Sequence, residues 1–150
     1  MKIASSPIYL DASAVAKIYI SEPDSDALES ALVGRRDLVV SDLAVTELTS
    51  AIARRVCDEQ LAASHAERVY RRILQDVNAG EFHRTELTAA AHREAERLLM
   101  GVGRRVPLRA ADALHLALAA LAGARVLITF DRHMTTAAKA LGTFELPASQ

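Results

Sequence analysis

The sequence predicts a single α/β domain in which helices cover a central parallel sheet. Short apolar, β-rich runs alternate with longer runs of helical periodicity, which is typical of parallel strands joined by helices. The 150 residues are the size of one ordinary domain, so we treat residues 1–150 as one unit. With 51% hydrophobic residues and only 4 Pro and 6 Gly, the composition favours a sizeable core and excludes a disordered or collagen-like chain.

The first half of the chain is expected to hold two strands and four helices. Ser41 or Asp42 is expected to cap the helix after the second strand, because both are favoured caps. Pro23-Asp24 is a favourable start for the helix that it precedes, and Gly80 suits a left-handed helix end. The expected strands are residues 8–10 and 37–40, and the expected helices are residues 13–20, 25–33, 43–57 and 64–78.

The second half continues the alternation of strands and helices. We expect a loop over residues 101–107, because two glycines and a proline interrupt the pattern there. The expected strands are residues 81–84, 125–130 and a final edge strand at 143–146, and the expected helices are residues 88–100, 109–122 and 132–141.

Charge, cysteine content and hydropathy exclude several classes of protein. The net charge of -1 gives no strong field toward nucleic acid or an acidic membrane. The single Cys57 excludes an intramolecular disulfide framework and a multi-cysteine metal site. The first residues lack the apolar stretch of a signal peptide, and no apolar run is long enough for a membrane span. We therefore expect a cytoplasmic location and no contact with a membrane.

Four carboxylates interrupt otherwise apolar local sequence. Asp11 and Asp131 each follow a predicted strand directly, and the carboxyl ends of parallel strands open into one crevice. Asp112 lies in a helix that is apolar nearly all round, where an unpaired ionised carboxylate is costly. Glu47 lies among apolar neighbours in the helix after the second strand. One crevice would explain all four positions.

Each acid also has a purely structural interpretation. Asp11 and Asp131 are suited to be helix N-caps, and Glu47 to be the solvated or salt-bridged edge of an amphipathic helix. Arg109, one turn before Asp112, is a candidate ion-pair partner for it, and a metal ion is the other.

Gathered carboxylates repel one another unless a divalent cation neutralises them. Hard oxygen ligands select Mg²⁺ or Mn²⁺ over zinc, and such ions commonly bind phosphate oxygens as well. Arginine pairs such as Arg35-Arg36 and Arg104-Arg105 suit phosphate, although any one pair is more simply a solvated helix face or end. The four acids thus indicate phosphate chemistry.

The order and spacing of these segments resemble the PIN-domain ribonucleases, most closely the VapC toxins of toxin–antitoxin pairs. The resemblance covers nearly the whole chain and is carried by residues 8–13, 41–48, 108–117 and 127–131. It implies a PIN-like three-layer α/β/α sandwich with a central parallel sheet. It also implies a type II toxin that is an Mg²⁺- or Mn²⁺-dependent endoribonuclease, hydrolysing RNA phosphodiesters with a metal-activated water.

The same resemblance implies a set of site residues and partners. Asp11, Glu47, Asp112 and Asp131 match the acidic catalytic metal site, and the hydroxyl residues Ser13 and Thr129 match supporting positions beside it. The implied partners are an RNA substrate, a cognate antitoxin protein and a second copy of the chain in a homodimer. Two features depart from the family pattern: Met134 replaces a frequent aromatic, and no further acid lies close to Asp131.

Other interpretations of the same residues remain. The alternative function is a non-catalytic module that binds RNA or protein through the acidic groove. A phosphoacceptor receiver-like domain is less suited to the sequence, because Lys139 falls in a predicted helix rather than after a late strand. His115, one turn from Asp112, is a candidate metal ligand, although a hydrogen-bonded core histidine is the better interpretation.

Overall fold

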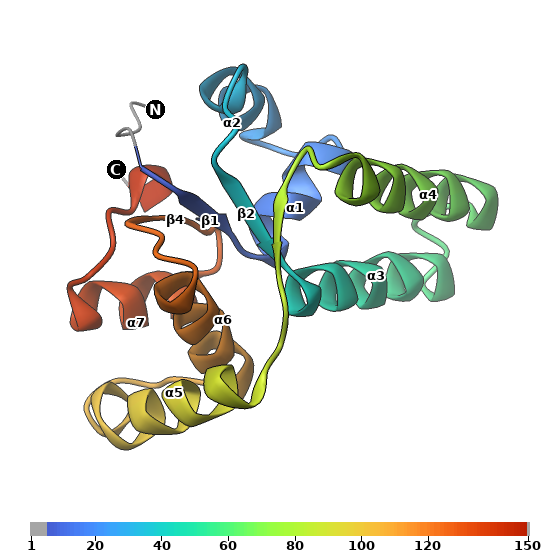
Figure 1. Cartoon of the computed structure of the whole chain (residues 1–150). Coiled ribbons are helices and arrows are strands. Elements are labelled where there is room, and N and C mark those ends of the chain that lie inside the picture. Colours follow the sequence, from blue (N-terminus) through green and yellow to red (C-terminus); the bar gives the residue numbers. More distant parts are fainter. Residues whose placement is uncertain (1–5, 150) are drawn as a thin grey trace.

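The protein is built on a four-stranded parallel sheet. The computed structural model describes residues 6–149. Its strands are β1 (Ile8–Leu10), β2 (Leu38–Ser41), β3 (His83–Thr85) and β4 (Val126–Ile128). They lie in the order β3-β2-β1-β4, and every neighbouring pair is parallel (Figure 1). The central strand β1 therefore ends beside β4, as the positions of Asp11 and Asp131 predicted.

Helices cover both faces of the sheet and complete a three-layer sandwich. The first layer holds α1 (Ala12–Tyr19), α2 (Ser25–Leu32), α3 (Asp42–Cys57) and α4 (Ala63–Ala79), and the second holds α5 (Ala89–Met100), α6 (Ala110–Leu121) and α7 (Arg132–Leu141). Alternation along β1 divides the core: Ile8 and Leu10 pack toward the first layer and Tyr9 toward the second. Figure 1 shows the two groups of helices on opposite sides of the strands. The predicted α/β sandwich with a parallel sheet is confirmed.

The helix ends follow from the local sequence. Ser41 caps α3 by accepting a hydrogen bond from the backbone N–H of Ala44 at 3.0 Å, and Thr88 caps α5 in the same way. Gly80 ends α4 with a φ of 78°, a left-handed conformation that glycine adopts without strain. The observed helix boundaries lie within one or two residues of those predicted.

Some predicted elements differ in the structure. The predicted edge strand at 143–146 is a single bridge between Glu145 and Val126, because Pro147 has no N–H to extend pairing and begins a 3₁₀ helix, η2 (Pro147–Ser149). The predicted loop at 101–107 contains another, η1 (Val102–Arg104). The helix α2 starts directly after Pro23-Asp24, as expected, but Asp24 has a φ of 71° and its side chain accepts no capping hydrogen bond.

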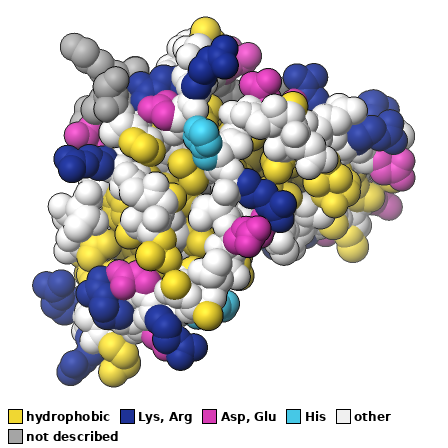
Figure 2. Space-filling view, viewed as in Figure 1, with side chains coloured by type: hydrophobic (Ala, Val, Ile, Leu, Met, Phe, Trp, Pro, Cys, Tyr) yellow, Lys and Arg dark blue, Asp and Glu magenta, His cyan; other side chains and the backbone are white. Residues whose placement is uncertain are grey.

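Charged side chains are dispersed over one face of the molecule. Figure 2 shows Lys and Arg side chains scattered over the visible face with acidic ones among them, rather than gathered in one basic patch. This agrees with the net charge of -1. Within residues 6–149, no helix combines the length and the apolar character needed to cross a membrane.

Candidate metal and nuclease site

All four predicted acids line one cleft at the carboxyl edge of the sheet. The cleft has a volume of about 340 Å³. It is bordered by the start of α1, the middle of α3 and the first turns of α6 and α7. The residues that bring charge or hydrogen-bonding groups to it are Asp11, Ser13, Glu47, Arg109, Asp112, His115 and Asp131.

Asp11 is buried and held by three hydrogen bonds. Its Oδ1 accepts from the Ser13 hydroxyl at 2.6 Å and from the backbone N–H of Ala14 at 3.0 Å, and its Oδ2 accepts from the Thr129 hydroxyl at 2.5 Å. Burial raises the pKa of Asp11, and these hydrogen bonds offset only part of that rise. Asp11 is thus both the N-cap of α1 and a wall of the cleft, so its two interpretations are compatible.

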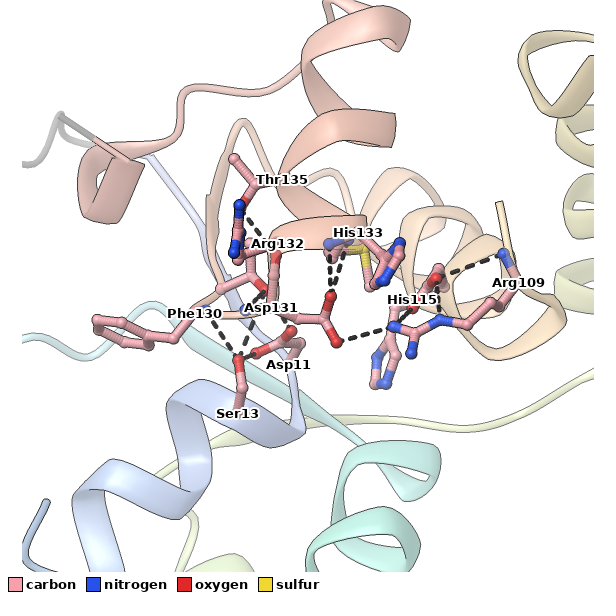
Figure 3. Close-up of polar contacts among 12 residues, drawn as sticks. Asp11, Ser13, Arg109, His115, Phe130, Asp131, Arg132, His133 and Thr135 are labelled. Carbon is pink, nitrogen blue, oxygen red and sulfur yellow. Dashed lines mark hydrogen bonds and ion pairs between the residues drawn. The ribbon is translucent and has the colours of Figure 1, made fainter. Parts of the chain in front are cut away.

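Ser13 and Thr129 connect two of the acidic segments. The Ser13 hydroxyl oxygen also accepts from the backbone N–H of Phe130 at 2.8 Å, and the Thr129 hydroxyl oxygen accepts from that of Asp131 at 3.1 Å (Figure 3). The two hydroxyls therefore fix the turn after β4 against the start of α1. Their predicted position beside the acids agrees with these contacts.

Arg109 bridges Asp112 and Asp131. Its Nε and Nη2 donate to the two carboxylate oxygens of Asp112 at 2.7 and 2.9 Å, and Nη2 also donates to Oδ2 of Asp131 at 2.7 Å (Figure 3). Arg109 is the N-cap residue of α6, so the pair with Asp112 spans one turn. Arg109, one of the two partners expected for Asp112, thus forms an ion pair with it.

Asp131 caps the first turn of α7. Its Oδ1 accepts from the backbone N–H groups of His133 and Met134 at 2.7 and 3.2 Å. Partial burial alone would raise the pKa of Asp131, but the hydrogen bonds from Arg109 and these amides outweigh it and hold that pKa below its usual value. Met134, the departure from the family pattern, is buried and packs in the core beside the cleft.

Glu47 is half-buried and is held by a chain of hydrogen bonds through buried polar side chains. Its Oε2 lies 2.6 Å from Nε2 of His115, whose Nδ1 lies 2.8 Å from the Tyr9 hydroxyl. Tyr9 donates in turn to the Ser41 hydroxyl at 2.7 Å. Burial is the main cause that raises the pKa of Tyr9, so the phenol stays protonated. These contacts agree with the interpretation of His115 as a hydrogen-bonded core histidine.

The oxygen donors of the cleft fit a hard divalent cation, but the carboxylates do not converge on one common position. Four carboxylates supply the oxygen ligands that Mg²⁺ and Mn²⁺ prefer. Within residues 6–149, however, no three carboxylate, imidazole or thiol groups stand close enough to ligate one ion. Arg109 supplies the positive charge at two of these acids.

The sequence interpretation missed part of this site. It did not assign the contact between Arg109 and Asp131, or the hydrogen bond from Tyr9 to Ser41. The contact joins residues 22 positions apart and depends on how α6 packs against α7. Tyr9 gave one usable signal, because a tyrosine in a fully apolar strand usually needs a partner for its hydroxyl.

A family comparison identifies the fold and the order of these segments. The PIN domain model matches residues 8–140. The chain belongs to the PIN domain family. It is also 36% identical over 143 residues to Ribonuclease VapC46 of Mycobacterium tuberculosis, an alignment that covers 90% of this chain and 92% of that protein.

Several solved structures share this fold. FitAcB of Neisseria gonorrhoeae superposes with a TM-score of 0.70 at 17% identity, covering 93% of this chain and 95% of that one. VapC20 of Mycobacterium tuberculosis, described as a Sarcin-Ricin loop cleaving toxin, gives 0.67 at 15% identity, covering 87% and 94%. VapBC2 of Rickettsia felis, bound to a DNA fragment from its promoter, gives 0.65 at 13% identity, covering 93% and 96%.

Proposed function

We propose that this protein is an endoribonuclease that acts as the toxin of a type II toxin–antitoxin pair. One observation carries the proposal: four acids from four separate segments of a PIN-family chain line a single cleft. The 36% identity to a VapC ribonuclease over nearly the full length supports the same activity. The sites of cleavage are RNA phosphodiester bonds, and residues 1–150 act as one domain.

Asp11, Glu47, Asp112 and Asp131 would hold Mg²⁺ or Mn²⁺, and we propose them as the catalytic set. A bound divalent ion lowers the pKa of water and stabilises the negative charge that develops on the phosphate. The protein's own hydroxyl groups would orient one of these ligands. Ser13 and Thr129 hold Asp11. Contacts of this kind around ligating groups tune metal affinity and geometry.

The partner that controls such a toxin would be an antitoxin protein. Structural neighbours of this chain include toxin–antitoxin complexes from Rickettsia felis, Salmonella typhimurium and Klebsiella pneumoniae. We infer a cognate antitoxin that covers the acidic cleft, and a homodimer of this chain. Light scattering of the purified protein, with and without its antitoxin, measures both assemblies.

Cleavage of a pool of cellular RNAs by purified, antitoxin-free protein tests the nuclease proposal. Reactions with Mg²⁺ or Mn²⁺ are compared with a chelated reaction, and new RNA ends are mapped. We expect discrete cuts that require the divalent ion and are lost in Asp11→Asn and Asp112→Asn. These variants keep side-chain shape but remove a carboxylate.

Asp26→Asn is the matched control, because it makes the same change at an exposed acid of α2 outside the cleft. It should cut like the unmodified protein. RNA that binds but stays intact with every ion would favour the alternative, a non-catalytic module that uses the same groove. Cuts that persist equally in both cleft variants would contradict the proposed site.

A further inference from the structure

Arg109 is an exposed cation that lines the acidic cleft. Its side chain is 56% exposed, whereas that of Asp112 beneath it is 6% exposed. Of the described residues that line the cleft, it is the one Lys or Arg among four acids. A cleft that binds RNA through metal-held acids still needs positive charge for the neighbouring phosphates.

The guanidinium occupies the oxygens that a divalent ion would need. Both oxygens of Asp112 and Oδ2 of Asp131 accept hydrogen bonds from it, and Oδ1 of Asp131 is taken by two backbone N–H groups. A guanidinium and a divalent ion on the same carboxylates would bring like charges within a few ångströms of each other. The two cations therefore compete for Asp112 and Asp131.

The position of Arg109 keeps a displaced guanidinium near the cleft. Arg109 is the N-cap residue of α6 and lines the cleft, so a guanidinium released from the carboxylates stays within the length of its own side chain from them. Its planar fork of N–H donors matches phosphate oxygens as well as it matches carboxylates. In Figure 3 a dashed line joins the Arg109 guanidinium to the Asp131 carboxylate.

We propose that Arg109 is a substrate-binding residue: Asp112 and Asp131 hold its guanidinium until a divalent cation takes these carboxylates, and the released guanidinium then binds an RNA phosphate beside the cleaved one. The inference rests on the proposed nuclease function. It makes metal binding the event that frees the positive charge, so the protein binds RNA best once its site holds the ion.

Two measurements on Arg109→Gln and Arg109→Lys test the proposal. The first is the dissociation constant for Mn²⁺, measured by titration calorimetry without RNA. The second is KM and kcat for a short RNA that carries a mapped cut, at saturating Mn²⁺ and several salt concentrations. Arg36→Gln is the matched control, because Arg36 is exposed and precedes β2 at the opposite edge of the sheet.

We expect Arg109→Gln to bind Mn²⁺ several-fold more tightly than the unmodified protein and to raise KM about tenfold. The slope of log KM against log salt should become shallower by about 0.7, the value for one lost phosphate contact on single-stranded RNA. Arg109→Lys keeps the charge and loses the fork, so it should raise KM while retaining the salt slope. Arg36→Gln should change none of these quantities.

The possible failures can be told apart. An unchanged Mn²⁺ dissociation constant in Arg109→Gln would overturn the competition, and an unchanged KM and salt slope would overturn the phosphate contact. If Arg109→Gln does not fold, judged by its melting curve in chelator, an unchanged KM in Arg109→Lys overturns the phosphate contact. An unmodified protein that neither binds Mn²⁺ nor cuts RNA would contradict the proposed function itself.

Discussion

At the scale of one residue, the fold has two opposing effects on the Asp11 carboxylate: hydrogen bonds stabilise its charge and burial destabilises it. The residue is 3% exposed, and its carboxylate keeps three hydrogen bonds in place of water. Its pKa is nevertheless raised, chiefly by burial. In the metal-free protein the ionised form of Asp11 therefore opposes folding, and a bound cation would remove that penalty.

Asp11→Asn should be increasingly stabilised relative to the unmodified protein as the pH rises. The unfolded carboxyl titrates near pH 3.9, and the folded one titrates higher. Between these values the native state holds more protons than the unfolded state, so its free energy of unfolding falls as pH rises. The variant lacks that titration. Urea unfolding in chelator across the range from pH 4 to above neutrality measures the difference.

The lowered pKa of Asp131 has the opposite effect on stability, but it is present in both proteins and cancels in the difference. Asp26→Asn, the same change at an exposed acid outside the cleft, is the control variant. A difference for Asp11→Asn that is flat, or that falls as pH rises, would show that burial does not govern this carboxyl.

Thr129 gives a second prediction at the residue scale. Its hydroxyl is buried, donates to Asp11 and accepts from the backbone N–H of Asp131. Thr129→Val keeps the shape and leaves both partners without the hydroxyl, so it should lower the free energy of unfolding by about 1–3 kcal/mol and reduce cleavage. Thr129→Ser keeps the hydroxyl and should retain most of the stability and most of the cleavage rate. Urea unfolding and initial cleavage rates measure the two effects, and equal losses in the two variants would contradict the assignment.

At the scale of elements, hydrogen bonds through three buried polar residues and the half-buried Glu47 join four segments across the sheet. Ser41 ends β2, Tyr9 lies in β1, His115 lies in α6 and Glu47 lies in α3. Polar groups in a low-dielectric core have few other hydrogen-bond partners, so their hydrogen bonds favour one arrangement of the helices and strands that carry them. These hydrogen bonds therefore fix the position of α3, which carries Glu47, relative to the central strand β1.

Tyr9→Phe should lower the free energy of unfolding by about 1–3 kcal/mol, because it leaves buried groups of Ser41 and His115 without their shared partner. Urea unfolding measures the loss. Tyr70→Phe removes the same hydroxyl from an exposed position on α4 and should be nearly neutral. Equal effects in the two variants would mean that the buried chain contributes little.

These contacts also mark how far the sequence could predict the site. The places of Asp11 and Asp131 were predictable, because adjoining parallel strands end at the same edge and both acids follow their strands directly. The pair of Glu47 and His115 was not, because it joins residues 68 positions apart and depends on the rotation of α3 against α6. Local periodicity fixes which face of a helix is apolar, but it does not fix which polar residue of another helix lies opposite.

Strand lengths were harder to predict than helix positions. The predicted strand at 125–130 spans only Val126–Ile128, since Thr129 and Phe130 turn toward the start of α1 through hydrogen bonds with Asp11 and Ser13. Those bonds come from residues more than a hundred positions away. The strand ends where hydrogen bonds to distant residues replace those to the neighbouring strand. The local sequence pattern does not predict that position.

At the scale of the whole molecule, the cleft exists only when the sandwich is assembled. Its four acids come from four segments, between residues 11 and 131, that touch both helical layers. The unfolded chain cannot gather them. Any cation that binds the proposed site must therefore bind the native state almost exclusively, and its binding free energy adds to the free energy of unfolding.

Mn²⁺ should therefore stabilise the protein in a concentration-dependent way. At about 100 times its dissociation constant the added free energy of unfolding should be about 2.7 kcal/mol, and excess chelator should reverse it. Asp112→Asn should lose most of this gain because it removes a proposed ligand, whereas Asp26→Asn, outside the cleft, should keep it. Urea unfolding at constant ionic strength separates site binding from general screening. An equal gain in both variants would place the stabilising ion elsewhere on the protein. An ion bound in the cleft would be ligated by Asp112, so its effect on stability should depend on that carboxylate.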